Sequence, residues 1–383
     1  MENTVRIMTD LIASEVCGKA LDRSEFKLSD EELRSLYKLS KSHDLAHIVG
    51  DALVKNDLIG DGEIKDRFKN QIMVSFYRYG KMNYELNRLK KVLNEAEIPY
   101  VPLKGALIRD YYPEPWMRTS CDIDILVHED QVDNAARIIV DKLGYTCDKN
   151  SYHDISMKSD SGVHLELHHS IKECKDNIDS LLSECWSYAS VYEDFEYRFS
   201  NEFFLFHQFA HASYHFLGGG CGVRPFIDIF LLERKLGFDR EALDDMLEKT
   251  GIKKFAYAAS DLSAVWFGDG SYNDVTRHVE RFVISGGVYG NADNSMAVSQ
   301  QTEKGRIGYI LHRIWLPYEM LCTVYPRLRG RRILQPAYEV KRWFRIFDPK
   351  ARKRKSRDLS AIGRLQTEKK EEVNRMLKEL GLM

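Results

Sequence analysis

Two aspartates stand two residues apart in a short alternating segment, Asp122-Ile-Asp124-Ile-Leu-Val127. Side chains along a strand point alternately to opposite faces, so the spacing predicts both carboxylates on one face and both isoleucines on the buried face. Neighbouring negative charges repel, and hard divalent cations such as Mg²⁺ prefer oxygen ligands. The segment therefore predicts a cation platform, with a water-exposed strand face as the alternative.

A third carboxylate, Glu166, lies in a second alternating segment, Val163-His-Leu-Glu-Leu-His168, where His164, Glu166 and His168 share one face. The 41 residues between Asp124 and Glu166 suffice for a helix and a hairpin, so Glu166 can return beside the aspartates. Three carboxylates on adjacent strands suit a two-metal site that activates an attacking hydroxyl and stabilises a leaving pyrophosphate. An amphipathic strand with solvated side chains is the alternative.

A glycine ends the apolar segment Val101-Pro-Leu-Lys104-Gly105 and precedes a stretch expected to be helical through Tyr111. A strand, a glycine and a helix start in that order can hold phosphate through backbone N–H groups and the helix dipole, and Lys104 adds a positive charge. A turn glycine beside a solvated lysine is the other interpretation.

Three histidines, His207, His211 and His215, recur every four residues on a predicted helix. They share a face, so nucleotide or acceptor contact, a transition-metal site and helix packing all stay open. The HExxH pattern is absent. Farther along, Arg224 and Asp228 are expected to form either a buried ion pair or a ligand contact.

The elements that must position these residues follow from the period of the apolar side chains. Helical spacing predominates to about residue 97, short alternating segments follow, and helical spacing returns from about residue 201. We therefore expect an α+β fold, in which a small mixed β-sheet core is flanked by N-terminal and C-terminal helical domains. The pattern predicts helices at about 74–96 and 132–143, and strands at 122–127, 152–157 and 163–167.

The expected organisation has four parts. Residues 1–97 form an N-terminal helical region, 98–200 the core that contains the sheet, 201–285 a helical domain, and 286–383 a mobile loop followed by a basic C-terminal region. The loop is expected over 286–299, which is rich in Gly, Asn and Ser.

Composition excludes several classes of protein. The 383 residues are 44% hydrophobic and 30% charged, which is typical of a globular protein and not of a fibrous or disordered one. No apolar run reaches the roughly 20 residues that a membrane-spanning helix needs, and the first residues do not resemble a secretory signal. The seven cysteines are dispersed, without a CxxC pair, and are expected to be reduced thiols. A cytoplasmic location is therefore expected.

Positive charge is concentrated near the C-terminus. The chain carries a net charge of −2, yet residues 327–357 contain 13 Lys or Arg and only two acidic residues. Aromatic residues, Tyr325, Trp343 and Phe344, are interleaved with these cations. The segment predicts a docking surface for an anionic partner, which could be RNA, anionic lipid or an acidic protein, with a solvated tail as the alternative.

Taken together, Lys104-Gly105, Arg118-x-x-x-Asp122-Ile-Asp124 and Leu165-Glu166-Leu-His168 resemble the signature of the polymerase β-like nucleotidyltransferase superfamily. The chain is most similar to the bacterial family known as uncharacterised or putative nucleotidyltransferases, most strongly over residues 99–170. The superfamily's usual turn is Gly-Gly or Gly-Ser and lies nearer to the first aspartate. Here 16 residues separate a single glycine, Gly105, from Asp122, so the form of the phosphate cradle is open.

The resemblance implies a role for each matching residue. Asp122, Asp124 and Glu166 would be the catalytic, metal-binding carboxylates, and Lys104, Gly105 and Arg118 would lie near the triphosphate. His168 is expected to contact the nucleotide and is a candidate for modest help with proton transfer.

The implied reaction moves a nucleoside monophosphate from an NTP, with ATP the expected donor, to an unidentified small-molecule or protein acceptor. Pyrophosphate is released, and two Mg²⁺ ions are the expected cofactors. Two alternatives stay open, a catalytically inactive nucleotide-binding or scaffold protein of the same fold and a metal-dependent hydrolase that uses the same carboxylates.

Overall fold

The computed structural model describes residues 2–150, 153–173, 176–302, 315–316, 318, 321–322, 325, 328, 330–344 and 367–383. Its N-terminal part is helical. The first helices are α1 (Glu2–Cys17), α2 (Asp30–Ser42), α3 (Ala46–Lys55) and the long α4 (Glu63–Glu95). The start of α2 is fixed by a capping box, because Ser29 and Glu32 each accept a hydrogen bond from the backbone N–H of the other.

A seven-stranded mixed sheet follows α4, with the strand order β3-β4-β5-β2-β1-β7-β6. β5 runs parallel to β2, and β7 runs parallel to β1, whereas the other neighbours are antiparallel. The expected α+β class with a mixed sheet and flanking helices is confirmed. The strands are β1 (Tyr100–Pro102), β2 (Asp122–Val127), β3 (Thr146–Asn150), β4 (Asp154–Lys158), β5 (His164–His168), β6 (Ala189–Glu193) and β7 (Glu196–Phe199).

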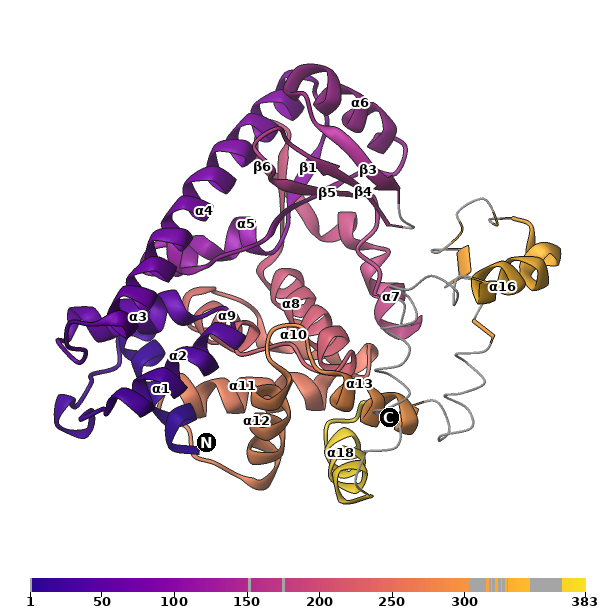
Figure 1. Ribbon diagram of the computed structural model, residues 1–383. Helices are drawn as coiled ribbons and strands as arrows, with labels where there is room; N and C mark the ends of the chain where they lie inside the picture. Colours follow the sequence, from indigo (N-terminus) through magenta and orange to yellow (C-terminus); the bar gives the residue numbers. More distant parts are fainter. Residues whose placement is uncertain are drawn as a thin grey trace.

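The two faces of the central strands have different environments. Ile123 and Ile125 of β2, with Leu165 of β5, belong to a core formed with the C-terminal half of α4 and with α6 (Val132–Leu143). α6 ends as predicted at Gly144, whose φ of 73° is readily adopted by glycine. Figure 1 shows α4 running from the N-terminal helices up to the sheet, beside α6. The opposite face is left to the polar side chains of the same strands.

Below the sheet in Figure 1 lies a body of helices that joins distant parts of the sequence. Buried side chains of α1 to α3 share one hydrophobic core with the helices that follow the sheet, and α1 packs directly on α11. The N-terminal and later helices thus form one body. The later helices are α8 (Asn201–Leu217), α9 (Arg224–Lys235), α10 (Arg240–Lys249), α11 (Lys253–Phe267), α12 (Asp274–Gly286) and α18 (Thr367–Glu379).

Some sequence predictions require correction. The loop expected over 286–299 is wrong from residue 292 onward, because α13 (Ala292–Thr302) begins there. The side chain of Asn291 accepts a hydrogen bond from the backbone N–H of Asn294 at 2.7 Å, and Ala297 and Val298 are buried in the large core. The sequence of α13 is mostly polar, so its buried face could not be recognised from composition. The helix expected at 74–96 begins earlier, at Glu63, and β3, β6 and β7 were not predicted.

Much of the predicted basic segment, including Arg327, Arg329 and residues 345–357, lies outside the described residues. The described part contains α16 (Gln335–Phe344).

Neighbouring positions of β5 should respond differently to substitution. Leu165 is fully buried, so Leu165→Ala should lower the free energy of unfolding by about 2 to 5 kcal/mol. The Glu166 side chain is one-third exposed on the other face, so Glu166→Gln should change stability little. Chemical denaturation of both variants measures the difference, and equal losses would contradict the assignment of the two faces.

Candidate active site

The three predicted carboxylates meet on the polar face of the sheet. β2 and β5 are in register, with Asp122 opposite His164 and Asp124 opposite Glu166. Ligand atoms of Asp124, Glu166 and His168 all lie within 4.8 Å of one another, and so do those of Asp122, His164 and Glu166. Because Glu166 belongs to both groups, the strands create two adjoining places where a cation could bind.

Burial and mutual repulsion make the carboxylates unequal. The pKa of Asp122 is raised because it is buried and faces the charges of Asp124 and Glu166. Burial would also raise the pKa of Asp124, but the positive charge of Lys104 and the hydrogen bond from His168 hold it well below its usual range. The cluster therefore keeps negative charge that a divalent cation would neutralise, and its oxygen-rich donor set suits Mg²⁺.

His168 lies against this cluster. Its Nε2 is 3.0 Å from Asp124 Oδ1 and 3.5 Å from Glu166 Oε2. Burial would lower its pKa, but these two carboxylates raise it to about 9, so the ring is protonated at neutral pH. In this state His168 is a cationic partner of the carboxylates and does not provide a free base.

Lys104 stands at the turn between β1 and the single-turn helix α5 (Gly105–Ile108), with φ 41° and ψ −116°, a conformation rare for a residue with a side chain. Burial opposes the charge on its amine, but Asp124, Glu173 and Asp122 outweigh burial and raise its pKa. Its ammonium has no hydrogen-bond partner among the described residues. Because α5 has only four residues, its dipole is weak, and the positive charge at this turn is mainly that of Lys104.

Gly105 is required by the close approach of a neighbouring loop. A Cβ atom added at this position would lie 3.2 Å from the Cβ of Ser120, which is tighter than ordinary van der Waals contact. The absence of a side chain at Gly105 therefore lets the loop before β2 lie beside the turn at Lys104.

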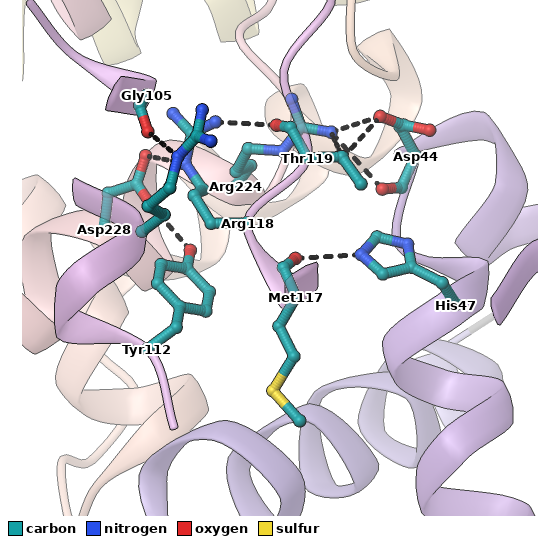
Figure 2. A network of polar contacts seen from close by, with 10 residues as sticks. Asp44, His47, Gly105, Tyr112, Met117, Arg118, Thr119, Arg224 and Asp228 are labelled. Carbon is teal, nitrogen blue, oxygen red and sulfur yellow. Dashed lines mark hydrogen bonds and ion pairs between the residues drawn. The ribbon is translucent and has the colours of Figure 1, made fainter. Parts of the chain in front are cut away.

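Two arginines that line the same cavity as the carboxylates are held by a polar network (Figure 2). Arg118 Nε donates to Asp228 Oδ1 at 2.9 Å, and the hydroxyl of Tyr112 donates to the same oxygen at 2.6 Å. Arg224 Nη2 donates to Asp44 Oδ2 at 2.5 Å. Asp228 is thus paired with Arg118, and not with Arg224 four residues earlier in the sequence.

Each guanidinium keeps donors for a ligand. Arg118 donates through Nε to Asp228 and through Nη1 to the carbonyl oxygen of Thr119. Arg224 donates through Nη2 to Asp44 and to the hydroxyl of Thr119. The remaining nitrogens of the two side chains have no partner in the described parts of the chain. Both arginines are thus fixed in position with free N–H groups, an arrangement suited to an anionic ligand.

Deep in the same network, His47 Nε2 lies 2.8 Å from the carbonyl oxygen of Met117 (Figure 2). Burial lowers the pKa of His47 to about 4, so the ring is neutral in the folded protein but gains a proton below about pH 6.5 when unfolded. Stability contributed by the neutral ring is therefore present above pH 6.5 and is lost as pH falls toward 4.

We expect the free energy of unfolding of the wild-type protein to fall by about 2 kcal/mol from pH 7 to pH 5, because His47 gains a proton only in the unfolded state over this range. His47→Gln keeps a donor amide at the position of Nε2 but cannot titrate. Unfolding free energies of the two proteins, measured by urea denaturation at both pH values, should therefore fall less in the variant. An identical pH dependence would contradict this explanation.

A cavity of about 400 Å³ joins these groups between the sheet and the helical body. It brings together six of the seven site residues predicted from sequence, whereas His168 contacts Asp124 and Glu166 but does not line the cavity. The lining residues are Lys104, Gly105, Arg118, Ser120, Cys121, Asp122, Asp124, Glu166, Gln208, His211, Ala212, His215, Cys221, Gly222, Arg224, Pro225, Asp228, Val288 and Tyr289.

A family model described as "Uncharacterised nucleotidyltransferase" matches residues 29–268. This chain belongs to that family. The match covers the sheet and every residue that lines the cavity except Val288 and Tyr289. The resemblance seen in the sequence is therefore confirmed, and the chain is a nucleotidyltransferase family member with the transferase class that this implies. No curated protein and no solved structure matches the chain.

In this nucleotidyltransferase the three predicted histidines have different environments. His207 is buried against Phe199 and does not line the cavity, whereas His211 and His215 do. Within the described residues, each group able to offer three ligand atoms to one ion is built on the sheet, and neither includes a histidine of α8. Packing therefore accounts for His207, and the cavity for the other two.

Sequence reasoning missed two charged residues that contact the site, Asp44 and Glu173. Asp44 holds Arg224 across 180 residues of sequence, and Glu173 holds His211 across 38. Neither lies in a local pattern, so only the tertiary fold could reveal them.

The described chain contains no helix long and apolar enough to cross a membrane.

Proposed function

We propose that this nucleotidyltransferase moves a nucleoside monophosphate from an NTP, with ATP as the proposed donor, to an acceptor oxygen, with release of pyrophosphate. The observation that carries the proposal is the convergence of Asp122, Asp124 and Glu166 on one face of the sheet, in a cavity that also contains three cationic side chains.

The carboxylates would hold two Mg²⁺ ions, one between Asp124 and Glu166 and the other between Asp122 and Glu166. When bound, these ions neutralise charge on the triphosphate and lower the pKa of the attacking hydroxyl. His168 would orient Asp124 through its hydrogen bond, and because it does not line the cavity it would act on the nucleotide only through the carboxylates. The rigid strands keep all three carboxylates at a fixed spacing, so little reorganisation is needed during the reaction.

Lys104, Arg118 and Arg224 would bind the triphosphate. Lys104 approaches from the turn after β1, and Arg118 lies next to that turn, because a Cβ added at Gly105 would be 3.6 Å from Arg118 Nη1. The tethering of the two arginines by Asp228 and Asp44 fixes their direction before a substrate arrives, which favours in-line attack at the α-phosphorus. Because Gly105 has no side chain, Ser120 and the guanidinium of Arg118 can lie close to the turn.

The proposal includes a location and a further partner. We propose a cytoplasmic protein, on the support that the six cysteines within the described residues are all free thiols, as a reducing compartment allows. We also propose that the basic segment 327–357 docks an anionic partner, on the support of its concentrated positive charge. The boundaries proposed near residues 97, 200 and 285 divide the chain into segments, of which the first and third share one hydrophobic core.

The reaction can be tested with each α-³²P-labelled NTP, Mg²⁺ and either the small-molecule or the macromolecular fraction of a cell extract. The proposal expects the label to move to an acceptor while pyrophosphate accumulates. A hydrolase would instead release labelled NMP without modifying an acceptor. A scaffold protein would bind NTP without turnover, and either result would replace the proposed function.

A further inference from the structure

A chain of three hydrogen-bonded side chains runs along the α8 side of the cavity. Glu173 Oε1 lies 2.8 Å from His211 Nδ1, and His211 Nε2 lies 3.0 Å from His215 Nε2. Glu173 is mostly buried, whereas His215 is exposed at the cavity wall. The chain therefore leads from a buried carboxylate to the space where substrates would bind.

The hydrogen bonds determine which ring nitrogens carry protons. An ionised carboxylate can only accept, so His211 Nδ1 donates to Glu173. In a neutral ring His211 Nε2 must then accept, and its partner His215 Nε2 must donate. The remaining nitrogen, His215 Nδ1, keeps a lone pair and has no hydrogen-bond partner in the described part of the chain.

Burial, with the nearby positive charge of Lys104, keeps the pair neutral before the reaction. Burial lowers the pKa of His211 well below its ordinary value, and the positive charge of Lys104 lowers it further. Burial also lowers the pKa of His215, against the opposing effect of Glu173. A proton that arrives at the pair is stabilised by the Glu173 carboxylate at its far end.

Resting on the proposed function, we propose that His215 is the general base of the transfer and that His211 and Glu173 are positioning residues. The acceptor O–H bond breaks as its oxygen bonds to the α-phosphorus, and the proton passes to His215 Nδ1. The bond from the α-phosphorus to the bridging oxygen breaks, and its electron pair leaves with pyrophosphate. His168 is unsuited to this role because its Nε2 is already engaged by Asp124 and Glu166.

The presence of a base indicates the chemical class of the acceptor. Phosphate and carboxylate acceptors are already anionic near neutral pH and need no proton removed, whereas alcohols retain theirs. The acceptor is therefore a hydroxyl compound, such as a sugar or a hydroxyl-bearing side chain.

The kinetic test uses the full chain with α-³²P-labelled ATP, Mg²⁺ and the extract fraction that the wild type labels. His215→Gln should lower kcat about 100-fold or more, since general bases typically contribute 10² to 10⁴, while KM for ATP stays within about threefold. Glu173→Gln should lower kcat about tenfold, and Glu173→Asp should recover part of it. The matched controls are His278→Gln and Glu379→Gln, because these residues form a His–Glu pair 3.3 Å apart outside the cavity.

The structural test uses ¹⁵N-histidine NMR of the full chain, which reports ring tautomers without a substrate. The proposal expects His211 protonated at Nδ1 and His215 at Nε2, with the His211 tautomer no longer fixed in Glu173→Leu, which has no acceptor at this position. Protonation of His215 at Nδ1 would overturn the proposal. If His215→Gln transferred the label with a kcat within threefold of the wild type, the role of His215 would be overturned while the proposed function stood. If the wild type transferred no label, the proposed function would be overturned as well.

Discussion

Asp124→Asn should reduce Mg²⁺-dependent transfer at least about a thousandfold, which corresponds to about 4 kcal/mol of lost transition-state stabilisation. Asp124 is buried at the centre of the cluster, and its carboxylate both faces Glu166 and accepts from His168. The amide fills the same volume and can still accept that hydrogen bond, so the variant should remain folded. Only the charge that attracts the cation is removed.

Initial rates with α-³²P-labelled ATP measure this effect, and circular dichroism checks the fold. Asp133→Asn is a suitable control because Asp133 is exposed in the first turn of α6, away from the cavity. Turnover within threefold of wild type in folded Asp124→Asn would contradict the two-metal assignment.

The companion variant Asp122→Asn separates catalysis from stability. Burial and the neighbouring carboxylates raise the pKa of Asp122, so its ionised form destabilises the metal-free protein at neutral pH. The substitution should increase the unfolding free energy in EDTA, by about 1.4 kcal/mol for each unit of pKa elevation that it relieves, and should abolish transfer.

Arg118→Met should cost about 3 to 5 kcal/mol of stability, because it leaves the buried carboxylate of Asp228 without its cation. Both side chains are almost inaccessible, with 11% and 6% of their surface exposed. The double variant Arg118→Met/Asp228→Asn removes both charges while the new amide still accepts from Tyr112. It should therefore recover most of the stability.

Activity should not return in that double variant, because the guanidinium proposed to bind the triphosphate is still missing. Urea denaturation and initial rates measure the two effects separately. Arg67→Met is the control, since Arg67 pairs with Glu63 on the surface, where such pairs contribute at most about 1 kcal/mol. Equal stability of Arg118→Met and wild type, or full activity of the double variant, would contradict the assigned role.

Local periodicity was sufficient to predict the strands that carry the site. The alternation at Asp122–Val127 gave the bounds of β2 correctly, and that around Glu166 placed β5 within one residue. Both strands have one apolar face against α4 and α6, so burial imposes the pattern on the sequence. Their parallel pairing, with Asp124 opposite Glu166, is consistent with the return of the chain inferred from sequence.

Features that depend on tertiary contacts could not be predicted in this way. α13 has a polar composition, and its burial depends on packing against α8 and α18, far away in sequence. β6 has almost no buried face, so it lacks the alternation that a half-buried strand shows. The pairing of Arg118 with Asp228 spans 110 residues, and a local pattern cannot encode a partner at such a distance.

The fate of the two ends of the triphosphate tests the central claim most directly. Parallel reactions with α-³²P-labelled and γ-³²P-labelled ATP, Mg²⁺ and the acceptor fraction distinguish which phosphorus is attacked. The account predicts that the α-label appears on the acceptor and the γ-label in pyrophosphate, in equal amounts, and that both products disappear in Asp124→Asn. Transfer of the γ-label to the acceptor, or release of the γ-label as inorganic phosphate, would contradict it.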